Sequence, residues 1–257
     1  MVMGINAKIA AISYLNTIPF VYGIRHEGSL CADILFAPPS ENVRHFIEGK
    51  ADLALVPAAV VPTLKDAEVI TDYCIGAVGP VRTVLVVSNT PIEQVERIWL
   101  DGHSRTSVQL CGYLAKHRWK IAPQWLAMED YSVMESPQQG NAFLIIGDKC
   151  FTYEGRYTYT YDLAEEWIAQ TRLPFVFAVW VARKGLSYDV HDALERCLTF
   201  GVEHTYEAIL ESEHRDKDYA YSYLTNNIDY LFDTQKHKAL KKFWDFGLKI
   251  EPKVNPG

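Results

Sequence analysis

Four short clusters of polar side chains could do chemistry, because each follows an apolar run or opens a predicted helix. Hydroxyl, amide and guanidinium groups bind anions, and the first turn of a helix adds unpaired N–H groups and a partial positive charge. The sequence therefore predicts capture of a small anion such as a carboxylate or a phosphate. The clusters are Ser13, Tyr14, Asn16 and Thr17; Arg82 and Thr83; Ser104, Arg105, Thr106 and Ser107; and Gly147 and Asp148.

Each cluster also has a purely structural interpretation. Ser104 could simply cap the helix that follows it. Arg82 and Arg105 could be solvated charges or partners in structural ion pairs. Asp148 could cap the next turn, although a carboxylate beside an anion site could also act as a general base.

Other kinds of site have little support. His45 and Glu48 share a helix face, but a metal site needs further ligands and none is near them in sequence, so we predict no metal. The chain contains neither G-x-G-x-x-G nor the P-loop motif, and no G-x-S-x-G elbow. We therefore expect no cofactor.

Apolar runs alternate with helical patterns along the chain, which predicts an α/β fold with largely parallel sheets. A buried strand should end just before Ser13, and ligands of such sheets sit at the carboxyl ends of strands. Further strands are expected at 52–56, 73–78, 84–87, 98–100, 143–146 and 177–182, with helices after Ser40 and Ser104, from about Leu163, and through the last seventy or so residues.

The order of these elements predicts two lobes. Residues 1–88 plus 181–257 should form a discontinuous first lobe, and residues 89–180 an inserted second lobe. Two chain crossings would then join the lobes, an arrangement that suits closure around a small ligand.

The composition and net charge of the chain limit the classes of partner that we expect. The 257 residues are 49% hydrophobic and carry a net charge of −7, without a Lys/Arg cluster, so nucleic acid is not an expected partner. No segment is long and apolar enough to span a bilayer, and the first residues lack the pattern of a secretion signal, so we expect a cytoplasmic protein. The five cysteines are far apart and predict reduced core thiols. Nothing in the sequence indicates an oligomeric state.

Several motifs resemble the menaquinone-biosynthesis family of the futalosine pathway. Within it the chain is more similar to the chorismate dehydratases than to the sister enzymes that form the dihydroxynaphthoate ring. The similar segments reach to about residue 185, and the S-Y-L-N run is the most discriminating. They are S-Y-L-N at 13–16 with Pro19, G-K-A-D-L-A-L-V-P at 49–57, G-P-V-R-T-V at 79–84, S-R-T-S at 104–107, Gly147 with Asp148, Y-D-L at 161–163, and L-P-F at 173–175 before Ala178 and Trp180.

The resemblance implies a type II periplasmic-binding-protein-like fold, with the ligand in a cleft between two α/β lobes. It implies removal of water from chorismate, a dianion, to give 3-[(1-carboxyvinyl)oxy]benzoate. The family pattern has serine where this chain has Thr83, which keeps the hydroxyl and adds a methyl group.

The resemblance also suggests roles for individual residues. Asn16 would orient the substrate at the reacting carbon, and the enolpyruvyl carboxylate of the substrate would take the proton, with Asp148 as the alternative base. The remaining candidates would bind substrate: Ser13, Tyr14, Arg82, Thr83, Ser104, Arg105, Thr106, Ser107 and Gly147. Two alternatives stay open: an intracellular small-anion binding protein without catalysis, and the sister enzyme acting on cyclic dehypoxanthine futalosine.

Overall fold

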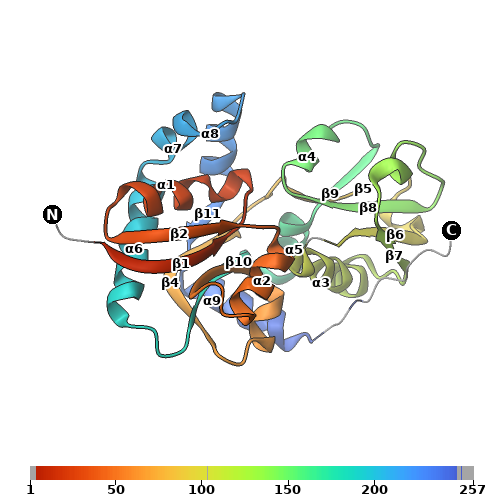
Figure 1. The fold of residues 1–257 in the computed structure, drawn as a ribbon. Helices are drawn as coiled ribbons and strands as arrows, with labels where there is room; N and C mark the ends of the chain where they lie inside the picture. The colour runs from red at the N-terminus through yellow and green to blue at the C-terminus, as the bar shows by residue number, and fades with distance from the viewer. Residues whose placement is uncertain (1–3, 103, 248–249, 251–257) are drawn as a thin grey trace. The chain divides into compact units, whose positions relative to one another are not determined.

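The computed structural model describes residues 4–102, 104–247 and 250, which form an α/β fold with two sheets (Figure 1). The strands are β1 (Ile5–Ala11), β2 (Leu30–Phe36), β3 (Leu53–Pro57), β4 (Ala67–Ala77), β5 (Val84–Ser88), β6 (Arg97–Asp101), β7 (Gln124–Met128), β8 (Asn141–Ile146), β9 (Tyr159–Asp162), β10 (Phe175–Arg183) and β11 (Asp229–Leu231). The helices are α1 (Ile18–His26), α2 (Pro39–Ile47), α3 (Arg105–Leu114), α4 (Lys149–Thr152), α5 (Leu163–Thr171), α6 (Tyr188–Glu203), α7 (Thr205–Glu211), α8 (Lys217–Asn226) and α9 (Thr234–Asp245).

Both sheets are mixed, so the expectation of largely parallel sheets was wrong. The first sheet has the order β11-β4-β10-β3-β1-β2, and the second has the order β7-β6-β8-β5-β9. β1 runs parallel to β2 and β3, and β6 runs parallel to β7 and β8. β10 is antiparallel to β3, and β5 is antiparallel to β8 and β9.

The chain divides into two compact units, residues 1–77 with 176–237 and residues 78–175 with 238–257. This differs from the predicted lobes 1–88 plus 181–257 and 89–180. β5 belongs to the second unit because it pairs with β8 and β9. Residues 238–247 belong there too, because Phe243 packs on Trp167 with ring centroids 6.1 Å apart. The chain therefore crosses between the units three times, where two crossings were expected.

The cores consist of strands that are buried along nearly their whole length. Every residue of β3 and of β8 is buried, as expected for strands covered on both faces. On β8, Phe143 and Ile145 point to one face, where they pack with Met128, Met134 and Cys150. The other face of this sheet is covered by α3 and α5.

In the first unit, α1 packs against α6 at a pair of glycines. A β-carbon on Gly23 would lie 1.8 Å from the carbonyl oxygen of Cys197, and one on Gly201 would lie 1.9 Å from that of Pro19. Only glycine allows the two helix backbones to approach so closely.

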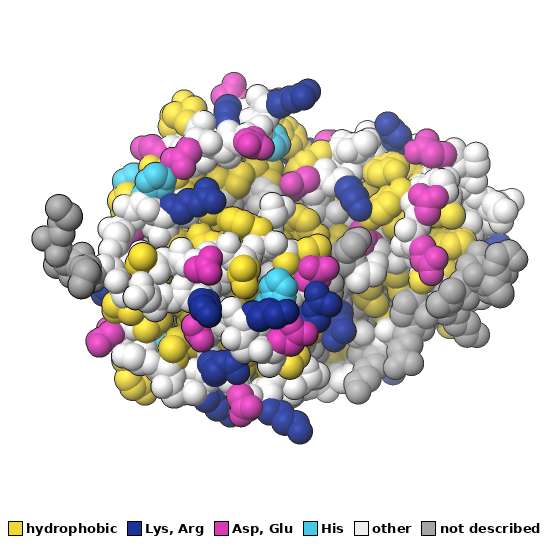
Figure 2. Space-filling view, in the orientation of Figure 1, with side chains coloured by type: hydrophobic (Ala, Val, Ile, Leu, Met, Phe, Trp, Pro, Cys, Tyr) yellow, Lys and Arg dark blue, Asp and Glu magenta, His cyan; other side chains and the backbone are white. Residues whose placement is uncertain are grey.

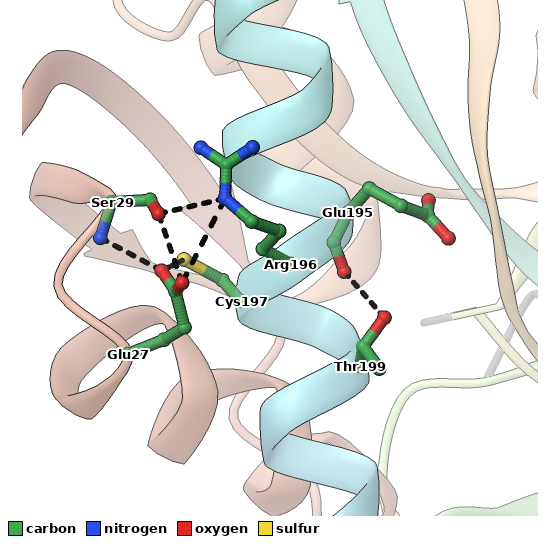
Figure 3. A network of polar contacts seen from close by, with 6 residues as sticks. All are labelled: Glu27, Ser29, Glu195, Arg196, Cys197 and Thr199. Atoms are coloured by element: carbon green, nitrogen blue, oxygen red, sulfur yellow. Dashed lines mark hydrogen bonds and ion pairs between the residues drawn. The ribbon is translucent and has the colours of Figure 1, made fainter.

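A polar network fixes the end of α1 against α6 (Figure 3). The Glu27 carboxylate accepts hydrogen bonds from the Ser29 backbone N–H at 2.7 Å, from the Ser29 hydroxyl and from the Cys197 thiol. Arg196 Nε lies 3.8 Å from the same carboxylate. Although burial opposes ionisation, these donors hold the pKa of Glu27 below its ordinary value. The role of this network is structural, because its contacts join the end of α1 to α6.

The structure also bears on the expectations about cysteines, membrane spans and charged side chains. Four cysteines are buried free thiols, as predicted for core residues, but Cys31 is exposed. In the described part of the chain no helix has the length and apolar character that crossing a bilayer requires. On the face in view in Figure 2, Lys and Arg side chains are interspersed with Asp and Glu side chains.

Candidate functional site

One edge of the second sheet gathers most of the predicted site residues. β6 and β8 are parallel and end at this edge, whereas β5 is antiparallel to β8 and begins there. Thr83, which precedes β5, therefore lies beside Gly147, which follows β8. The Gly147 N–H donates to the Thr83 carbonyl at 2.9 Å. The structure thus brings together two clusters that are more than sixty residues apart in the chain.

The turn after β8 is tightly defined. Gly147 has φ +66°, in the left-handed region that favours glycine, and its carbonyl accepts the Cys150 N–H at 3.0 Å. Asp148 is exposed and makes no side-chain capping bond to α4. The structural interpretation of Asp148 as a cap is therefore wrong.

The first turn of α3 supplies the hydroxyl groups. Ser104 is its N-cap, because the Ser104 Oγ accepts the Ser107 backbone N–H at 3.2 Å and lies 2.9 Å from the Ser107 Oγ. The capping role foreseen for Ser104 is confirmed. Thr106 and Ser107 are buried, with 0% and 1% exposure, whereas Arg105 is exposed.

Arg82 is held in an unusual conformation by Asp162. Arg82 has φ +63°, and its backbone N–H donates to Asp162 Oδ2 at 2.6 Å. The other carboxylate oxygen caps α5 by accepting the N–H groups of Ala164 and Glu165 at 3.0 and 3.2 Å. Burial raises the pKa of Asp162, and the backbone donors oppose that rise. One carboxylate thus sets the backbone immediately before Thr83.

The Arg82 side chain has a partner of its own. Its Nη2 lies 2.6 Å from Glu154 Oε1, in a partly exposed ion pair. Both residues line a hollow with about 680 Å³ of free space, partly open to solvent, whose wall also includes Asp162 and Glu165. Three carboxylates around one guanidinium make this hollow unfavourable for an anionic ligand.

Sequence reasoning missed three residues at the same sheet edge. The buried Asp101, 1% exposed, ends β6, and the phenol of Tyr131 donates to its carboxylate. The Lys149 ammonium lies over the Tyr131 ring, 3.9 Å from its centroid. The sequence offered one signal for Asp101, namely its position at the end of an apolar strand. No sequence pattern linked it to Tyr131 or to Lys149.

In the first unit, Ser13, Tyr14 and Asn16 follow the carboxyl end of β1 and lead into α1. The turn is fixed by Thr17, whose hydroxyl donates to the carbonyls of Ile12 and Tyr14 at 2.6 and 2.8 Å. Ser13 and Tyr14 line a hollow with about 470 Å³ of free space, partly open to solvent.

Asn16 is anchored from the other end of the chain. The buried Tyr230 phenol donates to the Asn16 carbonyl at 2.9 Å, and the Tyr230 ring packs on Phe20 at 5.1 Å. Burial raises the pKa of Tyr230 well above its ordinary value, so the phenol stays a donor. The strand β11 that carries it is secured by the buried Lys236, which bonds Asp229 at 2.5 Å.

The described residues include no group of three or more His, Cys, Asp or Glu side chains that could hold a metal ion. The candidate residues of the first unit offer hydroxyls and an amide, and those of the second unit offer hydroxyls, backbone N–H groups, cationic side chains and one carboxylate. Their chemistry is that of binding and orienting an anion.

Comparison with known structures identifies the fold. A protein from Archaeoglobus fulgidus aligns with a TM-score of 0.72 at 18% identity, covering 94% of this chain and 96% of that chain. A Candida albicans protein described as having the generic periplasmic binding protein fold aligns with a TM-score of 0.64 at 12% identity, covering 96% and 92%. An alkanesulfonate-binding protein from Xanthomonas axonopodis aligns with a TM-score of 0.61 at 12% identity, covering 94% and 90%. The expected periplasmic-binding-protein-like fold is confirmed.

Comparison of sequences identifies the family. A chorismate dehydratase from Thermus thermophilus is 27% identical over 190 residues, which are 66% of this chain and 68% of that protein. The family model described as menaquinone biosynthesis matches residues 7–249, nearly the whole chain. This chain therefore belongs to the menaquinone biosynthesis family.

Proposed function

We propose that the protein is a hydro-lyase that converts chorismate to 3-[(1-carboxyvinyl)oxy]benzoate and water in the futalosine pathway. The similarity to the Thermus chorismate dehydratase carries this proposal. The hydroxyl-rich edge of the second sheet supports it, because a dianionic substrate needs donors for two carboxylates.

The reaction needs little from the protein beyond binding and orientation. Removal of the C3 proton, which is vinylogous to the ring carboxylate, gives a delocalised anion that expels the C4 hydroxyl and becomes aromatic. The site must stabilise charge on the ring carboxylate and align the leaving hydroxyl, which is electrostatic preorganisation.

We assign the orienting role to Asn16, whose amide can donate and accept at once. Its backbone is held by Tyr230, so the amide starts from a fixed point in the chain. The enolpyruvyl carboxylate of the substrate takes the proton, and Asp148, exposed at the edge of the second sheet, is the alternative base.

Each unit offers its own candidates for carboxylate binding. Thr83, Thr106 and Ser107 offer hydroxyls, Gly147 shapes the turn beside Thr83, and Arg105 adds a positive charge at the start of α3. Ser104 acts through its cap, which orients the first turn of that helix. In the first unit, Ser13 and Tyr14 line a hollow, whereas Asn16 is not among its lining residues. The Glu154 ion pair makes Arg82 a weaker candidate for binding substrate than the sequence suggested.

Two other functions compete with this one. The sister activity in the same family acts on cyclic dehypoxanthine futalosine, and family membership alone fits both. A binding protein without catalysis would share the fold, as the similarity to an alkanesulfonate-binding protein illustrates.

Two parallel incubations distinguish the three candidate functions. Purified protein is mixed with chorismate or, separately, with cyclic dehypoxanthine futalosine, and the products are followed by mass spectrometry. We expect chorismate to lose one water and the futalosine derivative to stay unchanged. An Asn16→Ala variant shown to be folded should bind chorismate but turn it over far more slowly. Binding of chorismate without product, or turnover of the other substrate alone, would overturn the proposal.

A further inference from the structure

Lys149 is a cationic side chain at the edge of the second sheet that carries the candidate residues, and none of the ion pairs among the described residues includes it. Lys149 follows Gly147 and Asp148 directly, and Gly147 is bonded to Thr83. Within the described part of the chain, no carboxylate lies within ion-pair distance of the Lys149 ammonium. Arg82 differs, because Glu154 already neutralises its charge.

The position of Lys149 is fixed from two sides. Its backbone belongs to the tight turn closed by the Gly147 carbonyl and the Cys150 N–H, and the buried Cys150 thiol donates to Ile145. Its ammonium lies 3.9 Å from the centre of the Tyr131 ring, a distance suited to a cation–π contact. Such a contact places the charge without neutralising it.

Tyr131 is in turn held by Asp101. The phenol donates to the Asp101 carboxylate, which is 1% exposed and ends β6 just before the Ser104 cap. The Tyr131 ring also stacks on Tyr153, with centroids 6.4 Å apart and planes 22° apart. The bond from the phenol to the buried Asp101 carboxylate therefore sets the orientation of the Tyr131 ring.

We propose that Lys149 binds a carboxylate of the substrate, and that Tyr131, fixed by Asp101, is the positioning residue that holds the ammonium at the sheet edge. The ligand class is a small carboxylate anion. The inference rests on the proposed function in one respect, namely that the carboxylate belongs to chorismate.

Lys116 provides a matched control for Lys149. Both lysines are exposed, both belong to the second unit, and both lie over an aromatic ring, Lys116 at 5.8 Å from the centre of Phe246. Lys116 lies two residues beyond Leu114, the last residue of α3, at the end opposite to the Ser104 cap. Its charge is therefore remote from the proposed site.

The first test measures the Kd for chorismate by isothermal titration calorimetry. Lys149→Gln should weaken binding by about ten- to a hundredfold, since it removes a bond between two charged groups. Lys149→Arg should recover part of the loss, and Lys116→Gln should leave the Kd unchanged. The Kd of Lys149→Gln should also depend less on salt than that of the wild type, because one screened charge pair is gone.

The second test is a double-mutant cycle with Tyr131→Phe, which keeps the ring and removes the bond to Asp101. Alone, this change should raise the Kd, because the ring and the ammonium lose their fixed orientation. In the Lys149→Gln background it should have little further effect on the Kd. A merely structural role would instead lower the melting temperature by the same amount in both backgrounds and leave the cycle additive.

The outcomes distinguish the two proposals. If the wild type neither binds nor dehydrates chorismate, the proposed function fails. If the wild type does both, and Lys149→Gln matches Lys116→Gln in Kd and salt dependence, the role of Lys149 is refuted while the function stands.

Discussion

Asp162→Asn tests whether one carboxylate sets the backbone on which Thr83 depends. Asparagine keeps one acceptor oxygen, so if that oxygen continues to cap α5, the amide N–H₂ faces the Arg82 N–H donor. The lost bond is short, at 2.6 Å, and charge-assisted, which corresponds to about 1.5–3 kcal/mol. Removal of a buried charge offsets part of this loss. We expect a net destabilisation of about 2 kcal/mol and a fall in Tm of about 4–8 °C.

The assay is thermal unfolding of matched variants, with chorismate turnover measured on the same samples. Asp130→Asn is the control, because Asp130 also caps a turn by accepting the Ser132 N–H at 3.1 Å, but in an exposed position. Arg82→Gly gives a second comparison: glycine adopts φ +63° without strain, so Asp162→Asn should cost less in that background. Equal Tm losses for the Asp162 and Asp130 variants would refute the reasoning.

The pH dependence of the same variant has a definite sign. Burial raises the pKa of Asp162, so the folded state keeps this proton at a pH where the unfolded state has lost it. The stability contributed by this group is therefore greatest at low pH and declines as the pH rises from the unfolded pKa through the folded one. Asp162→Asn should lack that decline. A pH profile of Tm parallel to that of the wild type would contradict this assignment.

Three further perturbations test other parts of the structure. Tyr230→Phe should lower kcat for chorismate more than it raises KM, because only the bond to the Asn16 carbonyl is lost. The control is Tyr157→Phe, which removes a part-buried bond to the Met134 carbonyl in the second unit. Equal effects of the two changes on kcat would argue against a role of Tyr230 in positioning Asn16. A thiol reagent should modify Cys31 alone in the native protein and all five cysteines after unfolding; rapid native reaction of more than one thiol would contradict the burial of the other four. Burial raises the pKa of Tyr157 to about 12, so stability should fall as the pH rises from about 10, the unfolded value, toward 12, and Tyr157→Phe should show a shallower fall in Tm over this range.

Strands that are buried on both faces could be predicted from the sequence, because an uninterrupted apolar run is required there. The predicted runs at 84–87 and 143–146 match β5 and β8 to within two residues at each end. β2 was missed because it lies at the edge of its sheet, where Leu30 alone of its residues is buried and the exposed Asp33 interrupts the apolar run. The direction of each strand could not be predicted from the sequence, because an apolar run has the same pattern in parallel and antiparallel pairing.

The candidate site shows the same division between local and long-range signals. The Ser104 cap could be read from neighbouring residues, because helix caps are local. The anchors of the site could not, because each bond joins distant parts of the chain: Asp162 lies 80 residues from Arg82, and Tyr230 lies 214 residues from Asn16. Such partners depend on tertiary packing, for which a single sequence offers no periodicity.

The third chain crossing has a practical consequence for dissecting the protein. The segment 78–175 is contiguous in sequence, but its aromatic core is completed by the tail, where Phe243 packs on Trp167 and Phe175 and Phe246 packs on Tyr113. Expressed alone, this segment would leave large rings exposed to solvent and prone to aggregation. A soluble fragment of the second unit therefore needs the tail residues joined to it through an engineered linker.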